Sequence, residues 1–436
     1  MLVEFSVENY RSFQEKQTFS MVASDDETML EHNTFPMSNT NDLRLLKSAA
    51  IYGPNASGKS NLIKAMQTLR RLVTNSASRM QTGDKLPIEP FRLNSESAQK
   101  PTTFEVIFIH EGTRYEYGVS FNQERIYEEW LIAYPNEVKE NWFSRQYIPN
   151  DPRFESEAGY KWSFPKLKGE KKRIQKLVRP NSLFLSHAAQ NNHPQITPIF
   201  EYFFDKINII NSSQTRFGEF GFSINMCEDN IKFREQVVNL LNQADIGISD
   251  IRFESRPLTK TTRNLLKYWL SQEFEHQEIE DSIEIDEITR VSIITIHKMN
   301  DSNSAVEFDM DDESNGTSRL FSIAGYWLYV LQNGEVLIVD ELESSLHPEL
   351  SKALVKMFND PEVNKNNAQL IFATHDTTLL DEEILRPDQI WLTDKDNSMT
   401  KLYSLLDFRV REDESLQKGY LSGRYGAIPY IKRLTI

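Results

Sequence analysis

Hydrophobic and polar residues alternate with two different periods along this chain, and the two periods distinguish strands from helices. At the start, Val3, Phe5 and Val7 alternate with polar residues, which predicts a half-buried strand. The same kind of pattern predicts a second strand around Phe19 and Met21. Other strands are predicted at residues 49–52, 103–109, 114–121, 124–133, 290–298, 305–310, 335–340, 369–374 and 389–393.

Helices are predicted where apolar residues recur every three or four positions. Residues 61–73 show this spacing through Leu62, Ile63 and Met66, whereas residues 24–42 are polar and are predicted to form a loop. Other helices are predicted at residues 232–241, 261–274, 319–331 and 345–358. Because strands and helices alternate, with a β-rich stretch after the first helix, the pattern indicates an α/β protein.

The strongest chemical signal is Gly53-Pro54-Asn55-Ala56-Ser57-Gly58-Lys59-Ser60, which matches G-x-x-x-x-G-K-[ST] in full. A predicted strand precedes it and a predicted helix follows, so backbone N–H groups can surround a phosphate. Gly53 and Gly58 allow a close approach that a side chain would block. Lys59 is predicted to reach the β- and γ-phosphates, and Ser60 to bind Mg²⁺. This context disfavours the alternative, a glycine-rich turn without a function.

Two acids follow the apolar run at residues 336–339. Such a run is typical of a buried parallel strand, whose carboxyl end faces the ligand crevice of an α/β sheet. Asp340 is predicted to hold Mg²⁺, and Glu341 to polarise the attacking water as the general base. The pair is a weak signal alone, but it gains weight because it follows a complete P-loop.

Three further segments carry polar groups at the ends of predicted elements. His375 follows an apolar strand and could contact the γ-phosphate; a structural histidine is the alternative. Ser314 and Gly316 precede a helix and could form a second anion site, or an ordinary helix cap. Ser345 could cap the helix that follows, with Pro348 in its first turn, and this segment could also contact another subunit.

Composition narrows the functions that remain. The chain has 436 residues, 39% of them hydrophobic, so two or three domains are expected. The net charge of −15 excludes nucleic-acid binding by the whole surface. The single cysteine, Cys227, allows no internal disulfide, which suits the reducing cytoplasm. The alternating N-terminus does not resemble a secretory signal, and no apolar run approaches about 18 residues, so no membrane span is expected.

Two charged blocks lie in the middle of the chain. Residues 161–179 contain eight Lys or Arg residues against Glu170 alone, with Trp162 and Phe164 available for stacking. This block is a candidate surface for nucleic acid or an acidic partner, although an ordinary solvated surface is favoured. Residues 273–287 contain eight acids and no Lys or Arg, which indicates a solvated linker or a mimic of a polyanion.

Several of these segments together carry a resemblance to a known family. In chain order they are Asn9-Tyr10-Arg11-Ser12-Phe13, the P-loop, Ser314-to-Thr317, Asp340-Glu341, Leu346-His347-Pro348 and Thr374-His375-Asp376. This order resembles ABC-type ATPases of the SMC and RecF kind. It is more similar to stand-alone bacterial AAA/ABC-like ATPases of the RloA and abortive-infection type, which share the opening stretch and a C-terminal segment like residues 423–429.

The resemblance is weak across residues 135–290, and the chain departs from the related families in several ways. Residues 313–317 read Glu-Ser-Asn-Gly-Thr where transporter ATPases have Leu-Ser-Gly-Gly-Gln. A long coiled coil and a Cys-x-x-Cys hook, as in SMC proteins, are missing from the sequence. Only 61 residues follow His375, too few for the nuclease domain of OLD proteins. The glutamine that contacts Mg²⁺ in the family is not assigned to a position.

The resemblance implies an α/β P-loop NTPase of the ABC/SMC-like type, with a mixed central sheet, an added β-rich lobe and a helical lobe. Residues 1–135 and 301–436 would form the ATPase head, with residues 136–300 as a variable insert. It also implies a head-to-head homodimer, or a higher oligomer built from dimers, with ATP and Mg²⁺ between the P-loop of one subunit and residues 314–317 of the other.

The site residues expected from the motifs and the resemblance fall into three groups. Catalytic roles are assigned to Glu341, His375 and Lys59, and Mg²⁺ contacts to Ser60 and Asp340. Contacts with the nucleotide are assigned to Gly53, Asn55, Gly58, Lys59, Ser60, Asn61, Arg11, Ser12, Ser314, Gly316 and Thr317.

Three functions are compatible with this site. The preferred hypothesis is a cytoplasmic ATPase that acts as a switch in bacterial anti-phage defence, as the sensor or scaffold for a separate nuclease or toxin. The alternative is a RecF-type repair ATPase that binds DNA in an ATP-dependent way, through residues 161–179. A transporter ATPase is the third, and it would need a membrane subunit.

Overall fold

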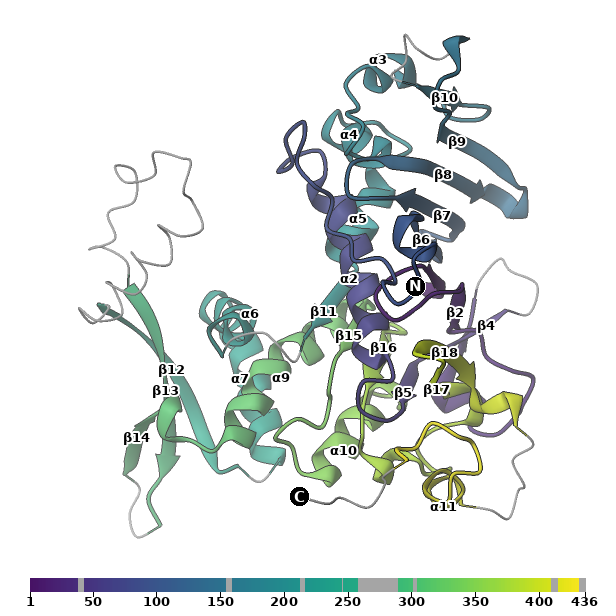
Figure 1. Cartoon of the computed structure of the whole chain (residues 1–436). Helices are drawn as coiled ribbons and strands as arrows, with labels where there is room; N and C mark the ends of the chain where they lie inside the picture. Colours follow the sequence, from purple (N-terminus) through teal and green to yellow (C-terminus); the bar gives the residue numbers. More distant parts are fainter. Residues whose placement is uncertain are drawn as a thin grey trace, which may run out of the picture. The chain divides into compact units, whose positions relative to one another are not determined.

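The computed structural model describes residues 1–37, 43–153, 159–211, 216–244, 246–257, 289–300, 304–408 and 415–430. The chain divides into two compact units, the first formed by Met1–Ser213 with Tyr329–Ile436 and the second by Gln214–Leu328 (Figure 1). The division at residues 135 and 300 stays a prediction.

A six-stranded mixed sheet forms the centre of the first unit. Its order is β11 (Ile207–Ile210), β15 (Val336–Val339), β16 (Gln369–Ala373), β5 (Ser48–Tyr52), β17 (Ile390–Asp396) and β18 (Met399–Ser404). The strands from β11 to β17 run parallel, and β18 pairs antiparallel with β17. The register pairs Val339 with Phe372 and Ala373 with Ile51, so β15, β16 and β5 end at nearly the same level. The three segments that follow these strands therefore meet at one edge of the sheet.

A seven-stranded antiparallel sheet forms the β-rich lobe of the same unit. Its order is β10 (Tyr160–Ser163), β9 (Glu140–Tyr147), β8 (Ile126–Tyr134), β7 (Thr113–Phe121), β6 (Thr102–His110), β1 (Leu2–Glu8) and β2 (Gln17–Ser20). The strands β6 and β7 are joined by Glu111 and Gly112, which are both at positive φ. This geometry is that of a tight hairpin turn.

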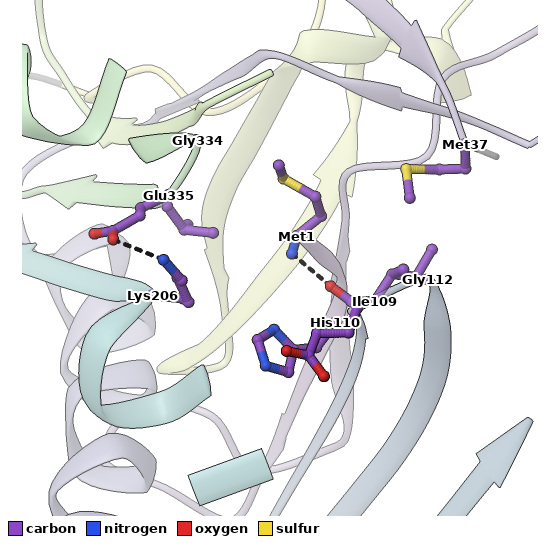
Figure 2. A pocket seen from close by; sticks show the side chains of 10 residues that line it. Met1, Met37, Ile109, His110, Gly112, Lys206, Gly334 and Glu335 are labelled. Carbon is purple, nitrogen blue, oxygen red and sulfur yellow. Dashed lines mark hydrogen bonds and ion pairs between the residues drawn. The ribbon is translucent and has the colours of Figure 1, made fainter. Parts of the chain in front are cut away.

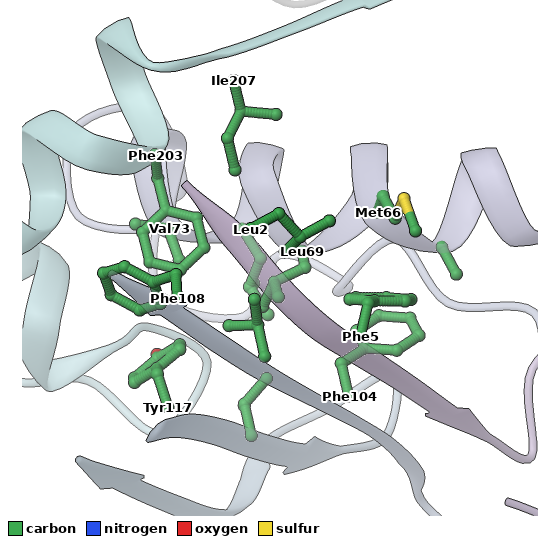
Figure 3. Packing of buried hydrophobic residues seen from close by; sticks show 14 of the residues in the cluster. Leu2, Phe5, Met66, Leu69, Val73, Phe104, Phe108, Tyr117, Phe203 and Ile207 are labelled. Atoms are coloured by element: carbon green, nitrogen blue, oxygen red, sulfur yellow. The ribbon is translucent and has the colours of Figure 1, made fainter. Parts of the chain in front are cut away.

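The main core lies between this sheet and the helix after the P-loop, α2 (Lys59–Asn75). Figure 3 shows Phe5 of β1 and Phe104 of β6 beside Met66 and Leu69 of α2. All of these side chains are buried. The apolar stripe that predicted the helix is therefore the face by which α2 packs on the β-rich lobe.

Shorter elements complete the first unit. Its other helices are α1 (Leu30–Asn33), α3 (Lys171–Gln175), α4 (Phe184–Gln190), α5 (Thr197–Asp205), α10 (Pro348–Asn359) and α11 (Leu416–Leu421). The strands β3 (Thr34–Pro36) and β4 (Arg44–Leu46) pair antiparallel. Short 3-10 turns lie at Ser97–Gln99, Pro135–Glu137, Thr377–Leu379, Pro387–Gln389 and Leu405–Asp407.

Among its described residues, the second unit contains helices and a small sheet. The helices α6 (Arg216–Asp229) and α7 (Ile231–Gln243) come first, and the sheet has the order β12 (Ile248–Pro257), β13 (Thr289–Lys298) and β14 (Ala305–Asp309). A 3-10 turn at Met310–Asp312 leads to α9 (Asn315–Asn333). The helix predicted at residues 261–274 and the acidic block at residues 273–287 lie outside the described residues.

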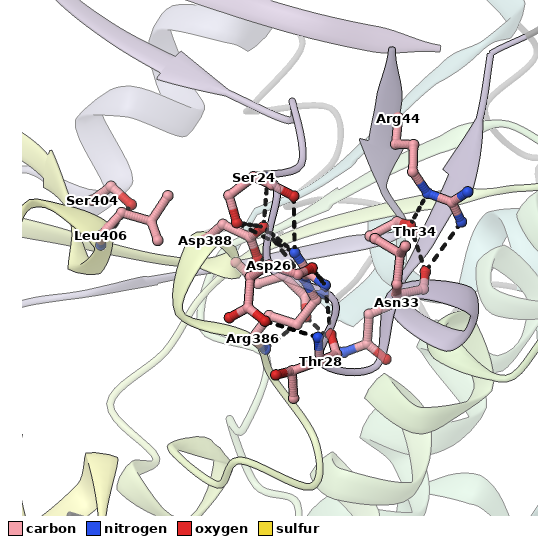
Figure 4. Close-up of polar contacts among 12 residues, drawn as sticks. Ser24, Asp26, Thr28, Asn33, Thr34, Arg44, Arg386, Asp388, Ser404 and Leu406 are labelled. Atoms are coloured by element: carbon pink, nitrogen blue, oxygen red, sulfur yellow. Dashed lines mark hydrogen bonds and ion pairs between the residues drawn. The ribbon is translucent and has the colours of Figure 1, made fainter. Parts of the chain in front are cut away.

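The predicted loop at residues 24–42 was wrong in part, because α1 and β3 lie within it. Arg386 holds the start of this segment in place (Figure 4). Its fully buried guanidinium pairs with Asp388 at 2.7 Å and donates to the carbonyl oxygens of Asp26 and Thr28 at 2.7 and 2.5 Å. Ser24 donates to Asp388 from its backbone N–H and its hydroxyl, both at 2.8 Å.

We expect Arg386→Leu to lower the free energy of unfolding by about 3–5 kcal/mol, because it leaves the Asp388 charge buried without its partner. Urea denaturation of the two proteins measures this change. Lys401→Leu is the control, since Lys401 pairs with Glu15 at the surface and its loss should cost only about 0.2–1 kcal/mol. Equal losses in the two variants would contradict the structural role of Arg386.

Candidate functional site

The P-loop connects the end of β5 to the start of α2 in a backbone conformation that requires glycine at two positions. Gly53 has φ +152° and Gly58 has φ +121°. A Cβ atom at Gly53 would lie 2.3 Å from the carbonyl oxygen of Thr393, and one at Gly58 would lie 2.3 Å from Oγ1 of Thr400. Neither approach is sterically allowed, so both glycines are needed for the loop to pack against β17 and β18.

Lys59 is the first residue of α2, and its ammonium group turns back into the loop. Nζ donates to the carbonyl oxygens of Gly53 at 2.8 Å and Pro54 at 3.2 Å. Burial lowers the pKa of Lys59 to about 8, while the charges of Glu343, Asp340 and Glu341 oppose this shift. The side chain is 6% exposed, so its charge is already inside the loop that would hold a phosphate.

Ser60 and Asp340 lie far apart in the sequence but meet at the edge of the central sheet. Ser60 Oγ donates to Asp340 Oδ1 at 3.0 Å. A hydroxyl beside a buried carboxylate fits Mg²⁺, which prefers oxygen ligands and usually combines one or two carboxylates with waters and substrate phosphates. The described part of the chain holds no group of three or more His, Cys, Asp or Glu residues placed to bind a metal by themselves.

Glu341 lies in the segment that follows β15. Its φ of +56° is unusual for a residue with a side chain, and the side chain is exposed beside the buried Asp340. The next backbone N–H, that of Leu342, donates to the carbonyl oxygen of Ala373 at 3.1 Å. This bond ties the segment with Glu341 to the end of β16.

His375 follows β16 and is exposed. Burial of part of the ring lowers the pKa of His375, the Lys59 ammonium lowers it further, and nearby acids oppose the change. Since the shift is downward from an ordinary value near 6.5, the imidazole is mostly neutral at pH 7. A neutral histidine at this place can both donate and accept a hydrogen bond.

Glu343 is a site residue that sequence reasoning missed. Its carboxylate accepts from Thr374 Oγ1 at 2.7 Å and from the backbone N–H of His375 at 2.6 Å. It is also the first among the acids that raise the pKa of Lys59. The available signal was a third acid in Asp340-Glu341-Leu342-Glu343, but only the pairing of β15 with β16 shows what this acid contacts.

The opening segment reaches the P-loop through Ser12. Ser12 Oγ accepts from Asn61 Nδ2 at 2.8 Å and lies 2.8 Å from Thr400 Oγ1, which donates to the carbonyl oxygen of Ser57 at 2.6 Å. Ser12 and Asn61 are thus brought together beside the loop.

The side chains of Arg11 and Asn55 do not take part in these hydrogen bonds beside the P-loop. Arg11 pairs with Glu89 at 2.7 Å, and both side chains are partly exposed. Asn55 is exposed at the tip of the loop. The structure therefore places Ser12, but not the Arg11 guanidinium, in the hydrogen bonds around the P-loop.

Ser314, Gly316 and Thr317 lie in the second unit, at the start of α9. Ser314 Oγ accepts from the backbone N–H of Thr317 at 3.0 Å and lies 2.9 Å from its hydroxyl, which is the geometry of a helix cap. The helix begins at Asn315, earlier than the predicted start near residue 319. The predicted start was late because the first residues of the helix, 315–319, include no large apolar side chain and so do not show the periodic pattern.

The start of α10 differs from the prediction in its cap. His347 caps the helix, since its Nδ1 accepts from the backbone N–H of Glu349 at 3.2 Å. Ser345 lies two residues before this cap at φ +61°, so its predicted capping role was wrong. Pro348 lies in the first turn, as predicted.

The cations of the basic block are exposed or partly buried. Arg179 donates to the carbonyl oxygens of Ser76, Ala77 and Met80 at 2.8–3.2 Å, so it closes the end of α2. Trp162 and Phe164 pack on Phe184, with ring centroids 5.7 and 5.3 Å away. The exposed cations are Lys161, Lys166, Lys168, Lys172, Arg173 and Lys176.

A cavity of about 200 Å³ lies at the other end of β15 (Figure 2). Its charged lining includes Lys206, which pairs with Glu335 at 3.1 Å, and burial raises the pKa of Glu335. Burial lowers the pKa of the Met1 amino group to about 5. Since Glu335 precedes β15 and Asp340 follows it, this cavity is separate from the residues gathered around the P-loop.

Comparison with known proteins identifies the family. The family described as "AAA domain, putative AbiEii toxin, Type IV TA system" matches residues 48–381, more than half of the chain. The chain therefore belongs to this family of P-loop ATPases. The predicted fold class, an α/β P-loop NTPase with a mixed central sheet and a β-rich lobe, is confirmed.

Solved structures with similarity to the chain include two SMC heads. The SMC head domain from Thermotoga maritima has 12% identity and a TM-score of 0.38, over 92% of this chain and 98% of that chain. The SmcHead bound to the C-winged helix domain of ScpA has 13% identity and a TM-score of 0.37, over 92% and 97%. With TM-scores below 0.5, these two similarities say nothing about the function of the chain. No curated protein matches the chain.

Among the described residues, every helix is too short or too polar to cross a bilayer.

The Lys59 environment predicts that ATP binding depends on pH. Phosphates stabilise the charged lysine, so its pKa must be higher in the complex than the value of about 8 without nucleotide. Above pH 8, binding then requires uptake of a proton, and the Kd for ATP should rise up to about tenfold per pH unit. Below about pH 7 the Kd should be independent of this group.

Calorimetric titration with ATP between about pH 6.5 and about pH 9.5 measures this dependence. Lys59→Arg is the matched control, because a guanidinium keeps its charge over the whole range. Its Kd should not rise with pH in this way. A wild-type Kd that is equally flat would show that Lys59 does not bind the phosphates.

Proposed function

We propose that this protein is a Mg²⁺-dependent ATPase whose ATP-driven dimerisation acts as a switch in bacterial anti-phage defence. It would serve as the sensor or scaffold for a separate nuclease or toxin. The observation that carries the enzymatic part is the 3.0 Å bond between Ser60 and Asp340, with Lys59 in the same site. This arrangement joins the P-loop to an acidic strand end, which phosphoryl transfer requires.

The proposed reaction assigns one task to each side chain. Lys59 binds the β- and γ-phosphates, and Ser60 and Asp340 hold Mg²⁺, which when bound neutralises charge on phosphate oxygens. Glu341 accepts a proton from the water that attacks the γ-phosphorus, so the products are ADP and inorganic phosphate. His375, mostly neutral at pH 7, donates a hydrogen bond to the γ-phosphate.

We further propose that a second copy of the chain completes the site with residues 314–317. Support comes from the start of α9, because Ser314 caps the helix and Gly316 lies in its first turn, which carries no acidic residue. The N-terminus of a long helix attracts anions through its free N–H groups and its dipole. Two nucleotides would then hold two subunits head to head.

The role in defence is supported by the family description, which names an "AbiEii toxin" and a "Type IV TA system". That description applies to the family. For this chain we propose the ATPase part of such a system, acting with a separate effector.

Glu341→Gln should trap ATP and a stable dimer, because the amide preserves the shape of the side chain but cannot accept the proton from water. Light scattering with and without ATP measures the dimer, and phosphate release should fall by at least about 100-fold. Lys59→Ala should lack tight ATP binding and stay monomeric. A Glu341→Gln protein that binds ATP but remains monomeric would contradict the composite site.

The defence role is tested with the neighbouring gene in the genome. We expect the two products to co-purify in at least one nucleotide state, and Lys59→Ala to abolish phage resistance in cells. If no partner binds in any nucleotide state, and resistance survives the substitution, the defence role is lost.

A second function, ATP-dependent binding of DNA, is supported by the exposed cations on the β-rich lobe. Each phosphate contact should contribute about −0.9 to the slope of log K against log salt. Replacing Lys172, Arg173 and Lys176 by Ala should therefore make this slope shallower by about 2–3. The matched control replaces three other exposed lysines, Lys85, Lys365 and Lys395. Absent or salt-insensitive binding by the wild type would remove this function.

A further inference from the structure

Glu343 connects two segments that the proposed reaction uses separately. It lies between β15 and α10, three residues after Asp340. Its Oε2 accepts from the hydroxyl of Thr374 at 2.7 Å, and its Oε1 accepts from the N–H of His375 at 2.6 Å. Both oxygens of one carboxylate are therefore bonded to the two residues that follow β16.

The bonded groups are fixed to different degrees. Thr374 is fully buried, and its own N–H donates to the carbonyl oxygen of Ile51 on β5 at 3.1 Å. His375 has an exposed side chain, and its backbone N–H donates to Glu343. Thr374 thus provides a rigid anchor for the carboxylate, which in turn holds the start of a more exposed segment.

The same carboxylate restrains the segment that carries Glu341. The turn from Glu341 to Ser345 contains two residues at positive φ, 56° and 61°. Such a backbone persists only where surrounding contacts hold it. Three hydrogen bonds do so from β16 and the two residues after it: the N–H of Leu342 donates to the carbonyl oxygen of Ala373, and Glu343 accepts from Thr374 and from His375.

We propose that Glu343 is a positioning residue that fixes Glu341 and His375 relative to each other. Glu341 can then activate the water while His375 contacts the γ-phosphate of the same nucleotide. This inference rests on the proposed ATPase function. It assigns Glu343 an effect on the hydrolytic step through these two residues, with little effect on ATP binding. Small displacements of reacting groups are costly, since a misplacement of about 1 Å can lower a rate by about 100-fold.

Glu343→Gln is the sharpest substitution, because it changes one oxygen to an NH₂ group that cannot accept a hydrogen bond. One of the two bonds must be lost, while size and packing are kept. We expect kcat for ATP hydrolysis to fall at least about tenfold, with KM changed by less than about threefold. Thr374→Val removes the hydroxyl that donates to Glu343 and leaves the bond from the His375 N–H in place. It should lower kcat by a smaller factor than Glu343→Gln does.

The double variant tests whether the two residues act as a unit. If they do, its loss of kcat should be well below the product of the two single losses. Glu349→Gln is the matched control, since Glu349 is an exposed acid of the next helix that pairs with Lys352. It should retain wild-type kcat. A thermal melt of each protein checks folding, and Thr374→Val supplies the test should Glu343→Gln be unstable.

Hydrogen exchange without nucleotide provides a readout that does not require catalysis. The peptide that contains the His375 amide should exchange faster in Glu343→Gln than in the wild type, and at the wild-type rate in Glu349→Gln. Unchanged exchange would overturn the inference. So would a wild-type kcat in Glu343→Gln, independent losses in the double variant, or a change in KM alone.

The two proposals fail in different ways. If the wild type hydrolyses ATP and Glu343→Gln hydrolyses it equally well, only the inference about Glu343 falls. If the wild type hydrolyses no ATP, the proposed function fails, and the inference falls with it even where hydrogen exchange responds to the substitution.

Discussion

The register of three parallel strands, which brings their carboxyl ends to the same level, is the constraint on which the rest of the structure depends. Because β5, β16 and β15 end together, the residues that follow them meet, although those after β5 are hundreds of positions away from the others in the sequence. The bond between Ser60 and Asp340 is the direct result. A shift of one strand by one residue would turn its side chains to the opposite face and separate these groups.

Burial gives this edge of the sheet its electrostatic character. A lysine and several acids share a site from which water is partly excluded, so each charge affects the others strongly. The pKa of Lys59 falls because burial outweighs the nearby acids. A triphosphate with Mg²⁺ would change this balance, since it brings both negative and positive charge to groups that are already in place.

The sequence predicted elements with strong patterns and missed those that depend on tertiary contacts. The stripe beginning at Leu62 correctly indicated α2, and the P-loop indicated its start. The helix α1 and the strand β3 have four and three residues, too few to show a period. Arg179 was assigned to a basic surface because charge alone does not reveal the carbonyl groups that bind it. Glu343 was missed because its partners follow a different strand.

The central claim is that Asp340 and Ser60 together form the Mg²⁺ site of a nucleotide pocket. The most direct test is the affinity for ATP with Mg²⁺ and with EDTA, in the wild type and in Asp340→Asn. The account predicts that Mg²⁺ strengthens binding at least about tenfold in the wild type, about 1.4 kcal/mol, and far less in the variant. An equal effect of Mg²⁺ on both proteins would contradict it.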